Sequence, residues 1–480
     1  MTDTKDNKKN TVETSVIQST KFYYNKGYQI IILLILINII FWIISKAIYN
    51  DWFVTPYKYV AKFSSFSATL LMAISLILTT RAKVLEDLFG GLDRVYKAHH
   101  MVGRYAFSLI LLHPLFLAIN SANASSSLSA FFSFFLPRFD SRYNVGHALG
   151  IFCLLAFFFL LYLTIQSKIS YEVWRKSHSF FGLLFSLIIL HILTSGGDIP
   201  KYPVFAVWYY SWLVVGLGCY LWTTFCRYRF GKKYHYHITF LEKAKETYEI
   251  VLTPNSNTET LSYRAGQFLY VKFCNNNLPQ EWHPYSIASF CENGIIKLGI
   301  KELGDYTSLL HNLRLMDKVE LSGPYGRLSE KMLINPVKEC VMIGAGTGIT
   351  PMISLWEYSL KTKRPAKTTL FYLAKDLENA TFNDDFVRLN NQYETNKNSY
   401  NLHLDHVQGF FNIDILAQNI VNFDNKFFFL CGPPRLVDML IVELKNKGVK
   451  NTNIIVEDFD FGIGNKKWFS HFSYFANSRI

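Results

Sequence analysis

Four histidines on two apolar segments are the residues of this chain whose types and spacing suggest chemistry. His99 and His113 lie on one segment, and His178 and His191 lie on the other. At the helical rise of about 1.5 Å per residue, each pair spans roughly 20 Å along its axis. Ionisable or metal-binding side chains are rare in membrane-spanning helices and mark functional sites there. Paired across two neighbouring helices, the four imidazoles can ligate two haems stacked through a membrane.

The inner histidine of each segment is followed by glycine at the same interval. Gly103 follows His99 by four residues, and Gly182 follows His178 by four. A missing side chain at these positions would let a flat macrocycle approach the helix backbone. His100 is a close rival to His99, which we prefer because its spacing to glycine repeats that of His178.

The two histidine spacings differ, which bears on helix geometry. Fourteen residues, from His99 to His113, return to nearly the same face of an α-helix, whereas thirteen, from His178 to His191, land well off it. We therefore expect a local distortion of the second segment. In the alternative interpretation, such histidines are interfacial and bond to headgroups or other helices, and we assign His147 to that class.

Composition divides the chain into a very apolar first half and an ordinary globular second half. Residues 1–27 are polar and aperiodic, so we expect a disordered cytoplasmic tail. Residues 28–230 should form an all-α, six-helix transmembrane bundle, because most apolar stretches within them approach the ~20 residues that span a bilayer. The stretches lie near residues 28–48, 63–80, 99–119, 147–166, 178–195 and 205–226.

Basic residues indicate how this bundle is oriented. If the N-terminus is inside, the inner loops carry more lysine and arginine than the outer loops, with Arg81, Arg94 and Arg175 among them. The positive-inside rule then places the N-terminus and the second half of the chain in the cytoplasm. This basic rim largely explains the formal net charge of +13. Nucleic-acid binding is the weaker explanation, because no basic stripe with interleaved stacking aromatics stands out.

The seven cysteines argue against disulfide and metal chemistry. None falls in an expected outer loop, and none forms a CxxC pair. This distribution disfavours disulfides, structural zinc and iron–sulfur ligation. Redox cofactors must therefore be held by other residues.

Residues 235–330 show the pattern of a small antiparallel β-barrel, with short alternating strands and turn signals. The motif HPYSIAS occupies residues 283–289. Backbone amides together with Ser286 and Thr307 can hold a pyrophosphate, and Tyr285 can lie against a flavin ring. The segment is therefore a candidate for binding a flavin nucleotide.

Residues 336–461 change to alternating strands and helices. An apolar strand runs into a glycine turn and a helix, where Gly344, Gly346 and Gly348 let the backbone approach a phosphate. A second strand, TLFYLAKD, and a third, FFFLC, follow, and the third ends in a tight CGPP turn that begins at Cys431. This alternation predicts an α/β doubly wound parallel sheet with ligands at the carboxyl ends of its strands.

Taken in order, these motifs carry a family resemblance. HPYSIAS, GPYG, GAGTGITP and CGPP resemble the FAD/NAD(P)H module of the ferredoxin-NADP reductase type. The preceding bundle, with His-xxx-Gly on two helices, resembles the ferric reductase transmembrane domain shared by NADPH oxidases and ferric reductases. The resemblance covers about residues 60–461. Because calcium-binding loops are missing, the chain is similar to the compact prokaryotic form.

The resemblance implies a stepwise electron path. NAD(P)H would deliver a hydride to FAD, which would release single electrons to an inner b-type haem at His99 and His178. An outer b-type haem at His113 and His191 would pass them to an acceptor outside. The flavin is needed because nicotinamide gives two electrons at once and haem iron takes one. The implied cofactors are thus FAD, two b-type haems and NADPH, with NADH as a second possible donor.

The resemblance also implies site residues. An aromatic residue near the C-terminus would stack on the flavin, Phe461 first and Phe459 next, and Phe461 with Cys431 would be catalytic. Residues 462–480 form a C-terminal extension that departs from the family pattern. The implied cofactor-binding residues are His283, Pro284, Tyr285, Ser286, Gly304, Thr307, Gly344, Gly346, Thr347, Gly348, Pro351, Lys375, Gly432 and Pro433.

Nicotinamide choice depends on the end of the second strand of the nucleotide domain. Lys375 lies near where relatives often place a basic residue against the 2'-phosphate of NADPH, while Ala374 replaces the hydroxyl side chain that often accompanies it. A lone lysine is a point charge rather than a bidentate clamp. We therefore expect only a moderate preference for NADPH.

Three functions stay open at this stage. An NAD(P)H oxidase making superoxide is the first, because the loop at 120–146 is rich in Ser and Phe and poor in the basic clusters that would hold an anionic iron chelate. A ferric-chelate or other metal reductase is the second, since Leu117 replaces a histidine that many eukaryotic oxidases carry. A haem-free membrane tether for a reductase module, or a nucleotide-regulated transporter, is the third.

The expected partners are NAD(P)H, the lipid bilayer and an extracytoplasmic acceptor, which is oxygen or a ferric chelate. No nucleic acid is expected, and the sequence names no protein partner. The expected location is the bacterial inner (plasma) membrane.

Overall fold

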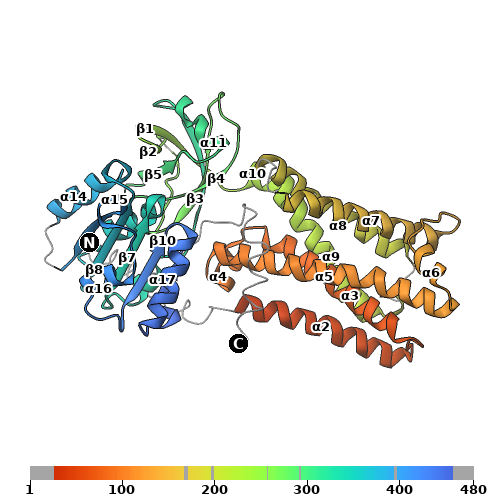
Figure 1. The fold of residues 1–480 in the computed structure, drawn as a ribbon. Coiled ribbons are helices and arrows are strands. Elements are labelled where there is room, and N and C mark those ends of the chain that lie inside the picture. The colour runs from red at the N-terminus through yellow and green to blue at the C-terminus, as the bar shows by residue number, and fades with distance from the viewer. Residues whose placement is uncertain are drawn as a thin grey trace, which may run out of the picture. The chain divides into compact units, whose positions relative to one another are not determined.

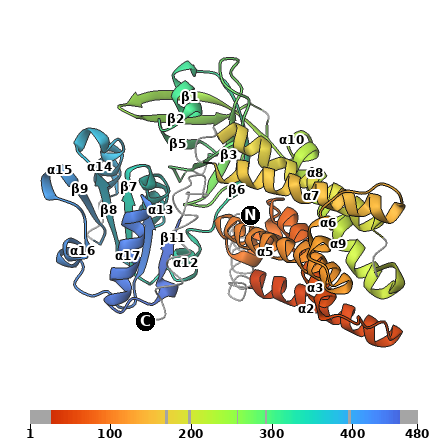
Figure 2. The same cartoon turned by 45° about the vertical axis from the view of Figure 1, so that its right-hand side comes forward.

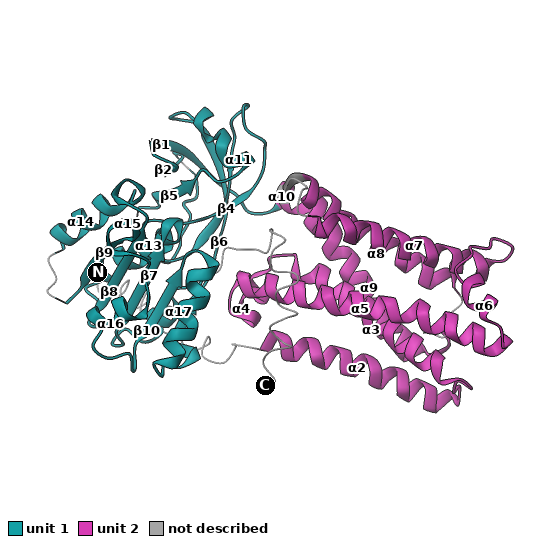
Figure 3. Cartoon of the chain, in the orientation of Figure 1, with its two compact units in different colours: residues 1–17, 231–460 teal, residues 18–230, 461–480 magenta. Residues whose placement is uncertain are grey.

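The computed structural model describes residues 26–166, 171–195, 199–256, 258–290, 293–393 and 397–457. Within them the chain divides after Phe230 into two units, which Figure 3 colours separately. We call the helical part up to Phe230 (magenta in Figure 3) the first unit, and the part from Gly231 (teal), which contains both β-sheets, the second unit (Figure 1).

Among the described residues of the first unit, six helices are long and apolar enough to cross a membrane. The predicted six-helix bundle is therefore confirmed. The six helices are α2 (Lys26–Tyr49), α3 (Pro56–Leu78), α5 (Leu92–Ser125), α7 (Arg142–Ile165), α8 (Tyr171–Thr194) and α9 (Pro203–Leu221). Shorter helical segments are α4 (Lys83–Phe89), α6 (Leu128–Ser133), η1 (Ile199–Lys201), η2 (Trp222–Cys226) and α10 (Arg227–Phe230).

Two helix pairings organise this unit. Helix α3 packs against α5 and α9, while α7 packs against α8, and the last two lie side by side in both ribbon views (Figures 1 and 2). Helix α3 is the most enclosed of the six, because 61% of the residues in its apolar stretch are buried. Large apolar side chains elsewhere face outward, for example Ile32, Leu155 and Val207. So much exposed apolar surface is stable in lipid rather than in water.

Some boundaries differ from those read from the sequence. Helix α2 includes Lys26 and Gly27, which the composition had placed in the polar tail. Helix α5 continues to Ser125, and α6 occupies Leu128–Ser133, so the expected loop at 120–146 is partly helical. The ends of these helices contain polar residues, so a hydropathy pattern misses them. The backbone is nevertheless helical there.

The FAD-type half of the second unit is a six-stranded antiparallel sheet in the order β4-β3-β6-β1-β2-β5. A bridge between Ile287, just after β4, and Leu298 of β5 joins the two edges of the sheet, which therefore curls into the predicted barrel. The strands are β1 (Tyr234–Ala244), β2 (Thr247–Pro254), β3 (Phe268–Phe273), β4 (His283–Ser286), β5 (Ile296–Lys301) and β6 (Lys318–Tyr325). Short helices α11 (Asp305–Ser308) and η3 (Leu309–Asn312) follow β5, and α12 (Glu330–Ile334) follows β6.

The other half is a five-stranded parallel sheet in the order β11-β10-β7-β8-β9. The chain leaves the central strand β7 in both directions, which confirms the predicted doubly wound topology. The strands are β7 (Cys340–Ala345), β8 (Thr368–Ala374), β9 (Ser399–Leu404), β10 (Phe427–Cys431) and β11 (Ile454–Val456). The helical segments are η4 (Gly346–Gly348), α13 (Ile349–Lys361), η5 (Leu377–Asn379), α14 (Asn383–Gln392), α15 (Asp405–Gln408), α16 (Ile413–Asn419), α17 (Pro434–Asn446) and η6 (Asn451–Asn453).

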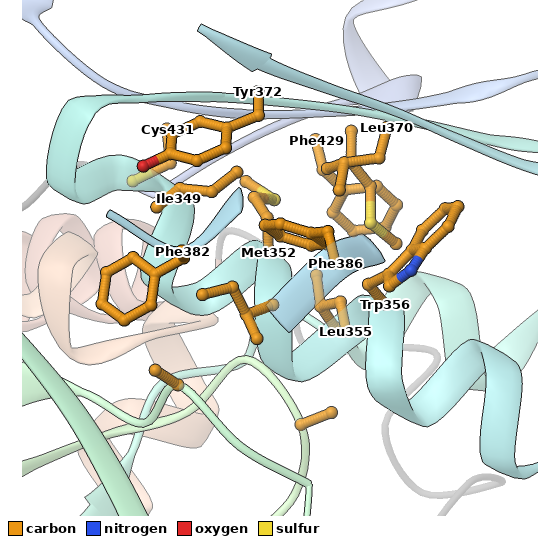
Figure 4. Close-up of a cluster of buried hydrophobic side chains, with 14 of the residues drawn as sticks. Ile349, Met352, Leu355, Trp356, Leu370, Tyr372, Phe382, Phe386, Phe429 and Cys431 are labelled. Atoms are coloured by element: carbon orange, nitrogen blue, oxygen red, sulfur yellow. The ribbon is translucent and has the colours of Figure 1, made fainter. Parts of the chain in front are cut away.

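Side-chain alternation along β7 divides the core between the two faces of this sheet. Cys340 and Met342 join the cluster that contains α13, and Val341 and Ile343 join the cluster on the opposite face. Figure 4 shows the first cluster, in which Trp356 of α13 is fully buried. Helix α13 is thus firmly seated against the sheet, and its N-terminus lies at the carboxyl end of β7.

Candidate functional site

Both histidines of α5 direct Nδ1 to an oxygen of α3. His99 Nδ1 lies 2.9 Å from Ser75 Oγ and 3.1 Å from the Ser75 carbonyl oxygen. His113 Nδ1 lies 2.9 Å from the Ala61 carbonyl oxygen. A carbonyl oxygen only accepts, so Nδ1 carries the proton and donates. The lone pair of each neutral imidazole is then on Nε2, the atom that can bind a metal.

Both histidines of α8 have the same relation to α7. His191 Nδ1 lies 2.7 Å from the Gly146 carbonyl oxygen, and His178 Nδ1 lies 3.4 Å from Thr164 Oγ1. A Cβ at position 150 would lie 2.6 Å from the His191 ring, so Gly150 makes room for it. Helix α8 is uninterrupted from Tyr171 to Thr194, so the local distortion expected from the spacing is wrong. The two imidazoles reach α7 from a regular helix.

The inner histidines are close enough to share one metal ion. The ring centroids of His99 and His178 are 6.1 Å apart, and metal–nitrogen bonds to imidazole are about 2 Å long. No group of three or more His, Cys, Asp or Glu residues in the described ranges could hold a metal ion. Two protein ligands per metal fit a porphyrin, which supplies the remaining four. His100 makes no side-chain hydrogen bond within the described residues, unlike His99.

The glycines after the inner histidines have different surroundings. A Cβ at Gly103 would meet no heavy atom within 4 Å, so that position leaves open space beside the helix. A Cβ at Gly182 would lie 2.0 Å from the Tyr220 ring. The absent side chain at Gly182 therefore makes room for Tyr220. The expectation that a macrocycle approaches the helix backbone at Gly182 is wrong, because the Tyr220 ring occupies that space.

Aromatic and hydroxyl side chains meet at β4 and α11 of the barrel. The ring centroids of His283 and Tyr306 are 3.7 Å apart, and those of His283 and Tyr285 are 6.5 Å apart. The Tyr285 hydroxyl is buried and has no hydrogen-bond partner within the described residues. Buried hydroxyl groups are normally hydrogen-bonded, so this one can bind a polar atom of a ligand. Burial, and next the neighbouring Tyr306, raises the pKa of Tyr285, so this hydroxyl keeps its proton and can donate.

The other predicted residues of the barrel lie at strand ends and in one turn. Ser286 is buried opposite Phe268 on β3, one register step beyond Tyr285. Thr307 Oγ1 accepts hydrogen bonds from the backbone N–H groups of Leu303 and Gly304, at 2.9 and 3.0 Å. Thr307 thus shapes the turn that precedes α11, and its contact with a pyrophosphate stays a prediction.

The glycine turn of the nucleotide half is tightly packed. A Cβ at Gly348 would lie 2.4 Å from the Cys431 carbonyl oxygen, and one at Gly432 would lie 2.8 Å from the Ala345 Cβ. These glycines bring the turn after β7 against the CGPP turn after β10. Gly346 has a φ of +55°, which side-chain-bearing residues rarely adopt. This turn forms η4 and leads directly into α13, and backbone amides at such a helix N-terminus can bind an anion.

A cleft of about 930 Å³ opens beside this turn. It brings together four of the predicted residues, Gly346, Thr347, Lys375 and Pro433. Other residues that line the cleft were not predicted from the sequence. They are Lys245, Glu246 and Lys301 of the barrel, and Asp376, Asp405, Phe410 and Arg435 of the α/β half. Their sequence separation gives no local signal, because the cleft forms only when the two folds pack together.

The remaining predicted residues are not among those that line the cleft. Gly344 lies in β7, Gly348 ends η4, Pro351 is in the buried first turn of α13, and Cys431 is buried at the end of β10. Phe461 and Phe459, like the extension at 462–480, lie outside the described residues.

Comparison with known families accounts for most of the described chain. Residues 64–189 match the ferric reductase like transmembrane component, residues 240–332 match an FAD-binding domain, and residues 342–441 match an oxidoreductase NAD-binding domain. These matches make the chain a ferric-reductase-like transmembrane flavoprotein with FAD-binding and NAD(P)H-binding domains of the oxidoreductase type.

Curated relatives resemble this flavoprotein over part of their length. It is 29% identical over 200 residues to one of the subunits of the Na(+)-translocating NADH-quinone reductase from Serratia proteamaculans (strain 568), covering 36% of this chain and 48% of that protein. It is 25% identical over 206 residues to a superoxide-generating NADPH oxidase heavy chain from Dictyostelium discoideum, covering 39% and 37% respectively. The chain thus spans about half the length of these relatives, or less.

A solved structure resembles part of this chain. The flavohem-like FAD/NAD binding domain of nitric oxide dioxygenase from Vibrio cholerae O1 biovar El Tor is 22% identical, with a TM-score of 0.41. The match covers 47% of this chain and 98% of that one.

Proposed function

We propose that this chain is a transmembrane NAD(P)H oxidase that passes electrons through FAD and two b-type haems to oxygen on the outer face, where superoxide forms. The observation that carries the proposal is the common environment of four histidines in the membrane unit. Each Nδ1 faces an oxygen of a neighbouring helix at 2.7 to 3.4 Å. Metal-binding histidines characteristically have such a partner, which sets the tautomer and orients the ring.

His99 with His178, and His113 with His191, would hold the two haems. When bound, FAD takes both electrons of a hydride and haem iron carries them one at a time. The protein fixes each imidazole in the tautomer that leaves Nε2 as the ligand atom. Because α3 and α7 supply all of these partners, the two helices position the ligands that α5 and α8 carry.

The soluble half would bind the two nucleotides. Tyr285 and Ser286 on β4, with the turn that Thr307 closes, would hold FAD. Gly346 and Thr347 of η4, just before α13, would hold the pyrophosphate of NAD(P)H, since helix N-termini offer free amides and a positive dipole end. Catalytic roles for Cys431 and Phe461 stay predictions of the resemblance.

The proposed orientation places the N-terminus and both nucleotide-binding domains in the cytoplasm, with the bundle in a bacterial plasma membrane. Three arginines support it by the positive-inside rule: Arg81 between α3 and α4, Arg94 in the first turn of α5, and Arg227 in α10, just after α9 and η2. NAD(P)H is then oxidised on the side where cells produce it.

Oxygen is the preferred acceptor because aromatic rings gather at the opposite end of the bundle. The ring centroids of Phe134 and His147 are 4.6 Å apart, with the rings edge to face. His147 Nε2 is buried and makes no hydrogen bond within the described ranges, so it can offer one polar contact to a small reduced species. The relative from Dictyostelium discoideum generates superoxide, which agrees with this choice.

A ferric-chelate reductase is the second candidate. The match over residues 64–189 to the ferric reductase like component favours it. Leu117 also favours it, because many oxidases have a second histidine one turn beyond the outer ligand of this helix.

The first test of the proposal is haem content. A pyridine haemochrome assay on purified protein should give two b-type haems per chain, held without covalent attachment because no CxxCH motif is present. Protein that folds, reduces its flavin with NAD(P)H and contains no haem would replace the proposal with a reductase module on a haem-free anchor.

A further inference from the structure

The nucleotide cleft has an unusual set of charges, contributed by both halves of the second unit. Its charged lining residues are Lys245, Glu246, Lys301, Lys375, Asp376, Asp405 and Arg435. The first three come from the barrel, at the β1–β2 turn and the end of β5, and the other four come from the α/β sheet. Their pairing decides what charge the cleft offers to a nucleotide.

Two of the barrel residues pair with each other, and the third reaches the α/β sheet. Lys301 Nζ lies 3.2 Å from Glu246 Oε2. Lys245 Nζ lies 2.5 Å from Glu378 Oε2 and 3.6 Å from Asp376 Oδ1. The β1–β2 turn therefore places a cation on the acidic residues that follow β8.

Asp376 stands where a doubly wound sheet selects its nucleotide. In such folds an acid near the end of the second strand binds the ribose 2'-hydroxyl of NAD, whereas a basic residue there accommodates the 2'-phosphate of NADP. Here Asp376 Oδ1 already accepts hydrogen bonds from the backbone N–H and the side-chain amide of Asn379, at 2.9 and 2.7 Å. The backbone N–H of Asn379 is the main cause that lowers the pKa of Asp376, so the carboxylate stays charged at neutral pH.

Two cations of the cleft have no acidic partner. Within the described residues, neither Lys375 nor Arg435 forms an ion pair, although both line the cleft. Asp405, the remaining acid, lies 3.7 Å from the imidazole of His403. Arg435 is exposed in the first turn of α17, and its planar guanidinium can bind a phosphate through two hydrogen bonds. The sequence alone singled out only the lysine.

We propose that Lys245 of the barrel, which lies 2.5 Å from Glu378 and 3.6 Å from Asp376, sets the choice of nicotinamide nucleotide by offsetting the charge of Asp376, so that Lys375 and Arg435 together bind the 2'-phosphate of NADPH. Lys245 is a positioning residue that acts through Asp376, and Arg435 is a specificity-determining residue that touches the phosphate. The inference rests on the proposed NAD(P)H-binding function and deepens it. It predicts a stronger NADPH preference than a lone Lys375 would give.

The test measures anaerobic flavin reduction by NADPH and by NADH in the full-length, FAD-loaded protein, which needs neither haem nor an outer acceptor. Lys245→Gln should weaken NADPH binding about two- to fivefold, the range expected for one exposed ion pair. NADH binding should change much less, because NADH has no 2'-phosphate for Asp376 to repel. The difference should shrink at high salt, which screens exposed charges.

Two further variants separate this role from a general structural one. Lys243→Gln is the matched control, since Lys243 lies on the same hairpin, pairs with Glu302 at 2.5 Å, is similarly exposed and does not line the cleft. It should leave both nucleotides unaffected. Asp376→Asn keeps the oxygen that accepts from Asn379 and removes the charge, so it should restore NADPH binding to Lys245→Gln.

A separate experiment tests Arg435. Adenosine 2',5'-bisphosphate and 5'-AMP are used as probes that compete with NADPH for the cleft. Arg435→Gln should weaken competition by the bisphosphate about tenfold, as expected for a charge-assisted phosphate contact, and should leave 5'-AMP nearly unchanged. Equal losses for both probes would place Arg435 on another phosphate and overturn its assignment.

The role of Lys245 is overturned if Lys245→Gln affects NADPH and NADH equally or not at all, or if Asp376→Asn fails to restore binding. Failure of the proposed function itself would look different. In that case the wild-type flavin would be reduced by neither nucleotide.

Discussion

The Nδ1 atom of His191 lies 2.7 Å from the carbonyl oxygen of Gly146, one helical turn before Gly150, whose missing side chain makes room for the same imidazole. The Gly146 carbonyl oxygen thus accepts a hydrogen bond from the ring, and the missing side chain of Gly150 leaves space for it. The position of His191 depends on its own helix and equally on the backbone of α7.

Gly150→Ala should therefore displace the His191 ring. The added Cβ would lie 2.6 Å from ring atom Cε1, a distance that real contacts do not reach, while the hydrogen bond to Gly146 restrains the ring. We expect loss of about one haem of two by the pyridine haemochrome assay, with NAD(P)H-to-ferricyanide activity of the flavin half retained. Gly218→Ala in α9 is the control, because its Cβ would meet nothing within 4 Å. Unchanged haem content in Gly150→Ala would mean that His191 does not hold a haem.

Removal of the ligands tests the assignment directly. Replacing His113 or His191 with Ala should remove the outer haem and stop electron transfer across the membrane, while NAD(P)H still reduces the flavin. Replacing His99 should remove the inner haem, whereas His100→Ala should leave both, because only His99 has its Nδ1 held by Ser75. If the His100 variant loses a haem and the His99 variant keeps two, the inner ligand must be reassigned.

The sequence predicted the parts of the molecule that depend on local periodicity. The six apolar helices, the barrel strands and the alternating strands and helices all leave a hydrophobic pattern, and the glycine turn after β7 is a short motif. Histidine is also rare enough in apolar helices for the four ligand candidates to stand out. These features need no knowledge of which segments meet in space.

The partners of those residues could not be predicted in the same way. Ala61 and Gly146 contribute backbone carbonyl groups, which every residue type has, so no side chain marks them. Lys245 contacts the residues after β8 only because the barrel packs on the α/β sheet. Gly182 was noticed in the sequence, but its role was predicted wrongly. The sequence does not show that Tyr220 packs against it.

The joint between the barrel and α13 gives a stability prediction. Buried Ser354 Oγ donates to the Ser289 carbonyl oxygen at 2.7 Å and accepts from the backbone N–H of Gly266 at 3.2 Å. Ser354→Ala removes the partner of the buried Gly266 N–H and of the half-buried Ser289 carbonyl, which should lower the free energy of unfolding by about 1–3 kcal/mol. Thermal unfolding followed by flavin fluorescence would measure it. Thr362→Ala, which removes one exposed hydrogen bond at the end of the same helix, should have a much smaller effect; equal shifts for the two variants would contradict the prediction.

The electron acceptor is the prediction that decides between the two proposed functions. The edge-to-face rings of Phe134 and His147 offer an aromatic surface with one polar ring, which suits a diatomic molecule better than a bulky anionic chelate. We therefore expect NAD(P)H-driven reduction of cytochrome c that superoxide dismutase suppresses, and we expect oxygen to receive most electrons when it competes with ferric citrate. His147→Ala should slow oxygen reduction while both haems remain, because His147 Nδ1 and Nε2 have no helix oxygen as a partner within the described residues. Turnover that is insensitive to dismutase, and that runs several times faster with ferric chelate under anaerobic conditions than with oxygen, would establish the metal reductase instead.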